Sequence, residues 1–100
     1  MAGKVTEHSM VCAIPGLTTE YLEDGEAIIQ PEQSSVHYGL NSVGGRVWSL
    51  IQHPTAVKRV YDVLLLEYDV DQERCMQELL ALLNDLVATD LATLIDGAAE

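Results

Sequence analysis

The sequence predicts an α+β fold in which a three-stranded antiparallel sheet is followed by three helices, in a winged helix-turn-helix-like order. Before residue 41, short β-prone runs alternate with turn-forming Gly, Pro and Asp residues. After residue 41, apolar residues recur at helical spacing. The chain of 100 residues is long enough for one domain. We place that domain at residues 11–95, between a flexible N-terminus (residues 1–10) and a tail (residues 96–100).

Turn signals delimit the predicted strands. Pro15-Gly16 ends the first β-prone run, and Asp24-Gly25 is a favoured hairpin pair before the second. Because the connections are short, an antiparallel meander is the simplest arrangement. The expected strands are residues 11–14, 26–30 and 35–40, with a weaker candidate at residues 18–22.

The third strand runs directly into the first helix, and the rest of the chain is organised around this junction at residues 35–51. Val36, Tyr38 and Leu40 occupy alternate positions, which is the period of a half-buried strand. We therefore expect these three side chains to hold the strand against the core. The backbone edge of the strand then remains available to a guest chain.

The first helix is part of this junction, and the second helix follows it. Asn41 can cap the first, which ends before His53-Pro54 because proline disfavours helix at the preceding residue. Gly44-Gly45 inside this helix indicates close approach to another backbone, here the sheet. Thr55 can cap the second helix. Its amphipathic stripe consists of Val57, Val60, Tyr61, Leu64, Leu65 and Tyr68.

The third helix, expected at residues 72–88, has Asp71 as its cap and carries two apolar stripes. The first stripe is Cys75, Leu79, Leu82 and Leu86, and the second is Met76, Leu80, Leu83 and Val87. Either the helix is central to the core, or one stripe faces the core and the other lines a groove. Glu78 and Asp85 border the first stripe, as a solvated edge or as polar anchors at the groove. Residues 91–95 form a last short strand or a frayed helical turn.

The composition excludes several partners. Sixteen acidic and five basic residues give a net charge of −11, which argues against nucleic acid and against an anionic membrane surface. No apolar run is long enough to span a membrane, and no secretory signal is visible, so a cytoplasmic location is the default expectation.

No motif for catalysis, cofactor binding or metal ligation is present in the sequence. Cys12 and Cys75 lack a CxxC partner, so we expect free buried thiols rather than a disulfide. The three histidines lie far apart, and no glycine-rich phosphate loop or nucleophile elbow occurs. We therefore expect a binding module with no catalytic residue, no cofactor and no metal.

Three classes of binding protein remain open. The first is a winged-helix DNA-binding regulator, although Arg74 is the only basic residue of the expected recognition helix. The second is an acyl-carrier-like protein, in which Ser42 would carry the prosthetic group. The third is a peptide-binding module that accepts an extended strand at the edge of its sheet.

Five segments of the chain occur in a characteristic order and spacing: residues 28–32, 38–41, 47–51, 68–71 and 78–86. Together they resemble the PqqD-like family, the small precursor-peptide recognition elements of ribosomally made and modified peptides, and the resemblance covers about residues 11–95. Gln52-His53-Pro54 replaces the Cys-Asp-Gly-like turn of the quinone-pathway protein, which favours the stand-alone members from lasso-peptide clusters.

The resemblance implies that the leader of a precursor peptide adds as a further strand against the third strand, in a cleft beside the third helix. In lasso systems the leader places a Tyr and a Pro in an apolar pocket. The module itself has no catalytic activity and delivers the precursor to a separate enzyme, either a lasso-peptide leader peptidase or, in the quinone pathway, a radical-SAM enzyme. The expected peptide-binding residues are Ser35, Val36, His37, Tyr38, Gly39, Leu40, Cys75, Glu78, Leu79, Leu82, Asp85 and Leu86.

Overall fold

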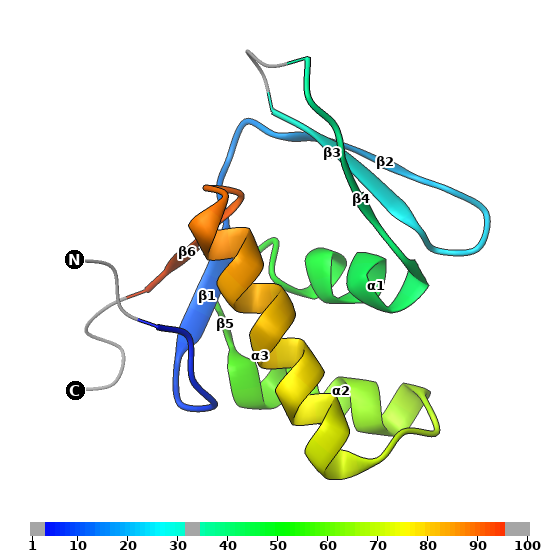
Figure 1. Cartoon of the computed structure of the whole chain (residues 1–100), viewed down its shortest axis with the longest axis vertical. Helices are drawn as coiled ribbons and strands as arrows, with labels where there is room; N and C mark the ends of the chain where they lie inside the picture. Colours follow the sequence, from blue (N-terminus) through cyan, green and yellow to red (C-terminus); the bar gives the residue numbers. More distant parts are fainter. Residues whose placement is uncertain (1–3, 32–34, 96–100) are drawn as a thin grey trace.

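Two three-stranded antiparallel sheets and three helices make up the residues that the computed structural model describes, 4–31 and 35–95 (Figure 1). The predicted α+β class with three helices is confirmed, and the strands are more numerous than predicted. The predicted tail at residues 96–100, and residues 1–3, lie outside the described residues. The elements are β1 (Met10–Ala13), β2 (Thr18–Tyr21), β3 (Ala27–Gln30), β4 (Tyr38–Leu40), α1 (Ser42–Leu50), β5 (Thr55–Ala56), α2 (Val57–Glu67), α3 (Gln72–Ala88) and β6 (Ala92–Leu94).

One sheet is the meander β2-β3-β4, in which β4 is an edge strand. Gly25 has a φ of +92° in the β2–β3 turn, which explains the Asp-Gly pair there. The predicted third strand is shorter than expected, since only Tyr38–Leu40 pairs with β3. Val36 is 53% exposed, so the prediction that its side chain holds this strand against the core is wrong.

The other sheet has the order β5-β1-β6. The first predicted strand therefore does not join the meander, because Val11 pairs with Thr55 on one side and Leu94 on the other. Gly16, with a φ of 89°, turns the chain away after β1, and β2 takes the place that we assigned to β1. Thr55 does not cap α2, since it lies in β5 and its hydroxyl donates to the carbonyl oxygens of Leu50 and His53.

A side-chain cap begins helix α1, and two contacts fix the helix against the meander. The Asn41 side chain accepts a hydrogen bond from the Gly44 N–H at 2.8 Å, which confirms the predicted cap. A Cβ at Gly45 would lie 2.1 Å from the carbonyl oxygen of Gly25, so the predicted close backbone approach is confirmed. The indole Nε1 of Trp48 donates to Thr19 Oγ1 at 2.8 Å and joins α1 to β2.

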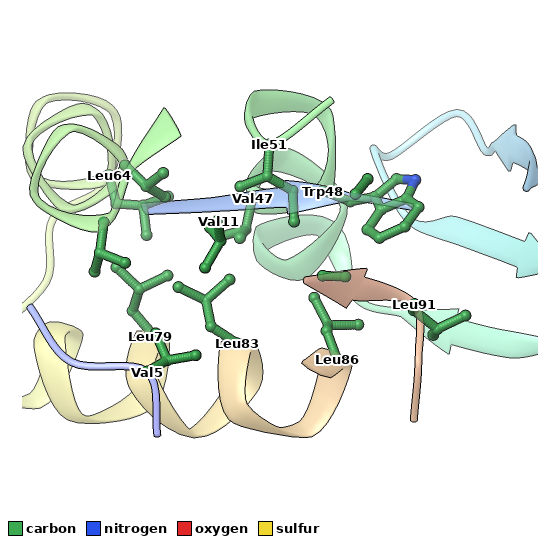
Figure 2. Packing of buried hydrophobic residues seen from close by; sticks show 14 of the residues in the cluster. Val5, Val11, Val47, Trp48, Ile51, Leu64, Leu79, Leu83, Leu86 and Leu91 are labelled. Atoms are coloured by element: carbon green, nitrogen blue, oxygen red, sulfur yellow. The ribbon is translucent and has the colours of Figure 1, made fainter. Parts of the chain in front are cut away.

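The core lies between α3 on one side and β1, α1 and α2 on the other (Figure 2). Figure 2 shows Leu79, Leu83 and Leu86 projecting from α3 toward Val11 and α1. The bounds of α3 and its Asp71 cap match the prediction. The two predicted stripes do not, because the buried residues of α3 come from both: Cys75, Leu79, Leu83 and Leu86.

The segment before β1 is also packed, which the prediction of a flexible N-terminus missed. Val5 is 2% exposed and belongs to the core cluster. The Asn84 side chain of α3 accepts from the Val5 N–H at 2.9 Å and donates to its carbonyl oxygen at 3.3 Å. Residues 4–10 therefore join the folded domain, which covers more of the chain than residues 11–95.

Candidate functional site

A cleft of about 630 Å³ opens between β4, the two helices α1 and α2, and the first half of α3. β4 contributes Gly39 and Leu40, α1 contributes Val43 and Val47, and α2 contributes Leu64. The loop at residues 68–71 closes one end. From α3 the lining residues are Arg74, Cys75, Glu78, Leu79 and Leu82.

The floor of the cleft is apolar. Val47, Leu64 and Leu79 are buried parts of the core whose surfaces also border the cleft. Val43 and Val70 lie at its margin and are 39% and 45% exposed. Apolar side chains exposed together at a concave site mark a place where a partner can bury them.

The edge of β4 lies beside this apolar surface. β4 pairs with β3 on one side, and within residues 4–31 and 35–95 no strand lies against its other edge. A strand edge offers backbone N–H and C=O groups to an extended chain. Such an edge next to apolar side chains provides the two parts of strand-addition recognition, with backbone hydrogen bonds for affinity and side-chain pockets for specificity.

Acidic groups predominate around the cleft. Asp69, Asp71 and Glu78 line it, with Arg74 as the only base among its lining residues. Arg74 Nε is 3.0 Å from Glu78 Oε2, and the Asp71 side chain accepts from the Arg74 N–H. Because Arg74 and Glu78 neutralise each other, Asp69 and Asp71 leave the cleft with a negative charge. This charge favours a guest with basic or neutral residues.

Cys75 forms part of the apolar wall. Burial raises the pKa of its thiol, and the negative charge of Glu78 raises it further. A thiol with a raised pKa stays protonated near neutral pH and is a poor nucleophile or metal ligand. Cys75 and Cys12 are both free thiols, and Cys75 is buried as predicted, whereas Cys12 is only half-buried.

An ion pair joins the two helices that form the floor of the cleft. Arg46 of α1 donates from Nε and Nη2 to the two carboxylate oxygens of Glu67 in α2, at 2.8 and 2.7 Å. This bidentate bond lowers the pKa of Glu67 and raises that of Arg46. The pair was not predicted, because 21 residues separate its members and no local sequence pattern relates them.

The structure brings half of the predicted peptide-binding residues to the cleft. Gly39, Leu40, Cys75, Glu78, Leu79 and Leu82 line it. Residues 35–37 precede β4, Tyr38 packs against the core, and the end of α3 lies past the cleft. The predicted residues that do not line the cleft are Ser35, Val36, His37, Tyr38, Asp85 and Leu86.

The contributions of α1 and of the loop at residues 68–71 to the lining of the cleft were not predicted. One signal was available for the loop. Val70 is an apolar residue between Asp69 and Asp71, in a segment otherwise typical of a solvated turn. Val43 gave a weaker signal as an apolar residue at the start of α1.

No group of three or more His, Cys, Asp or Glu residues in the described part of the chain could hold a metal ion. Among the helices described, none combines the length and the apolar character needed to cross a membrane.

Two solved structures share this fold. TbiB1 in complex with the TbiA(beta) leader peptide is 25% identical, with a TM-score of 0.72 over 89% of this chain and 99% of that chain. Lasso peptide synthetase B1 complexed with the leader peptide is 18% identical, with a TM-score of 0.68 over 82% of this chain and 95% of that chain. No curated protein sequence matches the chain.

The family described as Coenzyme PQQ synthesis protein D (PqqD) matches residues 26–92, which run from the start of β3 into β6. This segment holds β4, the three helices and every residue that lines the cleft. The match covers more than half of the chain, and it agrees with the resemblance that its segments show. The chain is a member of the PqqD family.

Proposed function

We propose that this protein binds the leader region of a ribosomally made precursor peptide and delivers it to a partner processing enzyme. The leader adds as a strand along the edge of β4 and places apolar side chains in the cleft beside α3. The observation that carries this proposal is the position of an unpaired strand edge directly beside the apolar cleft, among the residues described. Two solved relatives of the same fold hold leader peptides, which supports it.

The protein acts without catalysis of its own in this proposal. Its one cleft-lining thiol has a raised pKa, and the cleft's basic side chain is paired with Glu78. In this proposal the enzyme served is a leader peptidase of the lasso-peptide type. The lasso class is supported by the name of one solved relative, lasso peptide synthetase B1 complexed with the leader peptide, and the peptidase is what the resemblance implies. The site of action is the cytoplasm, where a ribosomally made precursor is first available.

Titration of the isotope-labelled protein with a synthetic leader tests the binding step. The peptides tested are the leaders of any short precursors found in the neighbourhood of this chain's gene, and scrambled peptides of equal composition are the controls. Amide signals of Gly39, Leu40 and residues 75–82 should shift with the leader and stay in place with the scrambled peptide. Shifts that spare both β4 and α3 contradict the proposed site.

Delivery needs a separate test. The partner peptidase should cleave the full precursor much faster when this protein is present, and the gain should vanish when excess free leader competes. Equal cleavage rates with and without the protein contradict delivery while leaving leader binding intact.

The family description favours a second candidate, presentation of a quinone precursor to a radical-SAM enzyme. The two candidates share the cleft and differ in the partner. Genomic neighbourhood separates them, because a peptidase and an asparagine-synthetase-like cyclase accompany lasso chemistry, whereas a radical-SAM enzyme accompanies the quinone pathway. Duplex DNA binding at physiological salt would instead support a winged-helix regulator, and a phosphopantetheine mass increment on Ser42 an acyl carrier.

A further inference from the structure

Gly39, in the middle of β4, is a glycine that the protein's own fold does not require. Its φ is not positive, and a Cβ placed on it meets no atom within 4 Å apart from its chain neighbours. Gly25 and Gly45 differ, since the first has a positive φ and the second lies against a carbonyl oxygen. Glycine weakens a strand, and inside a strand it often marks a place where a ligand or another chain approaches closely.

The side of the sheet that Gly39 faces follows from the register. Gly39 pairs with Ile28, whereas its neighbours Tyr38 and Leu40 pair with the buried residues Ile29 and Ala27. Residues paired across a sheet share a face, so Gly39 and Ile28 lie on the outer face, away from the core.

A second, smaller hollow of about 290 Å³ lies at this position. Leu22 and Ile28 line it together with Gly39. Gly39 and Leu40 border both this hollow and the larger cleft beside α3. β4 therefore lies between the two hollows, and a strand added at its open edge would lie near both.

We propose that the guest leader carries a second anchor, a bulky apolar and preferably aromatic side chain that lies across the bare backbone of Gly39 and contacts Ile28 in the outer hollow. Ile28 is on β3, one strand beyond β4 as seen from the guest. Strands in a sheet lie about 4.8 Å apart, so only a long side chain reaches it, and its path crosses the place where a β-carbon at residue 39 would stand. This inference rests on the proposed function and adds a subsite to it.

The spacing of the leader's anchors follows from strand geometry. Successive side chains of an added strand point to opposite faces. The outer anchor is therefore an odd number of residues away from the anchors that enter the cleft beside α3. A leader with anchors on one face only would not use the outer hollow.

Gly39→Val tests the subsite directly. Valine favours a strand and meets open space here, so the melting temperature should equal or exceed that of the unmodified protein. The same valine blocks the path to Ile28, so the affinity for the synthetic leader, measured by fluorescence anisotropy, should fall at least tenfold. Thr18→Val is the matched control, because it adds a valine to the same outer face on the opposite edge strand, and it should bind normally.

Leader variants complete the test. Alanine at the outer anchor should weaken binding to the unmodified protein and have no further effect with Gly39→Val, a non-additivity that identifies direct contact. Equal affinity of Gly39→Val and the unmodified protein overturns the subsite alone. So does a leader scan in which no two required residues are an odd number apart. Failure of the unmodified protein to bind any leader overturns the proposed function together with it.

Discussion

Leu82 and Leu83 are neighbours in α3 with opposite assignments, and replacing each with aspartate separates the cleft from the core. Leu82 lines the cleft and is half-buried. Leu83 is 0% exposed and belongs to the core cluster. A carboxylate at position 82 can turn toward solvent at the cleft, whereas at position 83 it has no route out of the core.

The two variants should differ strongly in stability. Burial of a whole leucine side chain contributes about 1.5–3 kcal/mol, so half-buried Leu82 contributes about 1 kcal/mol, or roughly 4–8 °C in melting temperature. At Leu83 the loss of the side chain costs about 2–5 kcal/mol even with alanine, and the buried carboxyl adds about 1–3 kcal/mol. The sum approaches the whole stability of a small domain, about 5–15 kcal/mol, so Leu83→Asp should be largely unfolded.

Circular dichroism and leader anisotropy measure the two effects separately. Leu82→Asp should keep its helical signal and lose leader binding by tenfold or more, and Leu82→Asn should show the same loss if the missing contact is apolar rather than electrostatic. If Leu82→Asp unfolds like Leu83→Asp, then Leu82 belongs to the core and our assignment of the cleft face of α3 is wrong. Normal leader binding by a folded Leu82→Asp would remove the cleft from the proposed site.

Three further predictions concern the framework around the cleft. Glu67→Gln should lower the melting temperature at pH 7, and the difference should disappear as the pH falls below the pKa of Glu67, which the bond from Arg46 holds under its ordinary value of 4.5. The pKa of Glu67 is lower in the folded than in the unfolded protein, so the bond stabilises the fold above the unfolded pKa, and this contribution is lost as the pH falls through the folded pKa. A difference in melting temperature that persists at pH 2 contradicts this reasoning. Gly45→Ala should destabilise the protein by about 1–3 kcal/mol in denaturant titrations despite its better helix propensity, because the new methyl group meets a backbone carbonyl; an unchanged midpoint would show that α1 can move away. Asn84→Ala should speed hydrogen exchange at the Val5 amide, and equal protection in both proteins would mean that burial alone holds this segment.

Local signals in the sequence were sufficient for the three helices and for the caps of α1 and α3, but not for α2, which Thr55 does not cap. Asn41 and Asp71 precede apolar-periodic runs, and each side chain accepts a hydrogen bond from the backbone N–H of the third residue of its helix, Gly44 or Arg74. The Gly44-Gly45 pair also correctly predicted a close approach to another backbone. The two caps depend on residues within one turn, whereas the sequence did not identify the Gly25 carbonyl group as the neighbour of Gly45.

Pairings between distant segments were not predictable from such signals. β1 joins β5 and β6, whose partner residues lie more than 40 positions away, and both partners are too short to show a periodic pattern. The hydrogen bond between Asn84 and Val5 spans 79 positions and depends on how the segment before β1 packs against α3. Short strands and single side-chain contacts are decided by tertiary packing rather than by propensity.

The candidate site was half predictable for a related reason. Positions 82 and 83 are about 100° apart on a helix, and both are leucines, so the sequence does not tell which one faces the core. The placement of β1 and α1 decides it, and they bury Leu83 together with Leu79 and Leu86. The resemblance to the PqqD-like family located the cleft between the third strand and the third helix, but the walls from α1 and the loop at residues 68–71 required the structure.

The length of β4 determines how much of the affinity of the proposed complex comes from backbone hydrogen bonds and how much from side chains. β4 has three residues, and alternate residues of a strand direct their backbone groups to opposite edges. Its open edge therefore offers the N–H and C=O groups of either Gly39 alone or Tyr38 and Leu40 together. Two to four hydrogen bonds at about 1 kcal/mol each give about 2–4 kcal/mol, whereas micromolar binding needs about 8 kcal/mol beyond the cost of ordering the peptide.

The larger part of the affinity must then come from side chains in the cleft and, in our inference, in the outer hollow. If side chains supply most of the affinity, the position of the β4 edge relative to the two hollows matters. Helix α1 holds the meander in place through the Trp48–Thr19 hydrogen bond and the contact of Gly45 with the β2–β3 turn. A fixed edge keeps both hollows at a constant distance from the guest backbone, so no free energy is lost in positioning them. In the proposed complex, a short edge flanked by apolar hollows selects its guest mainly by side chains.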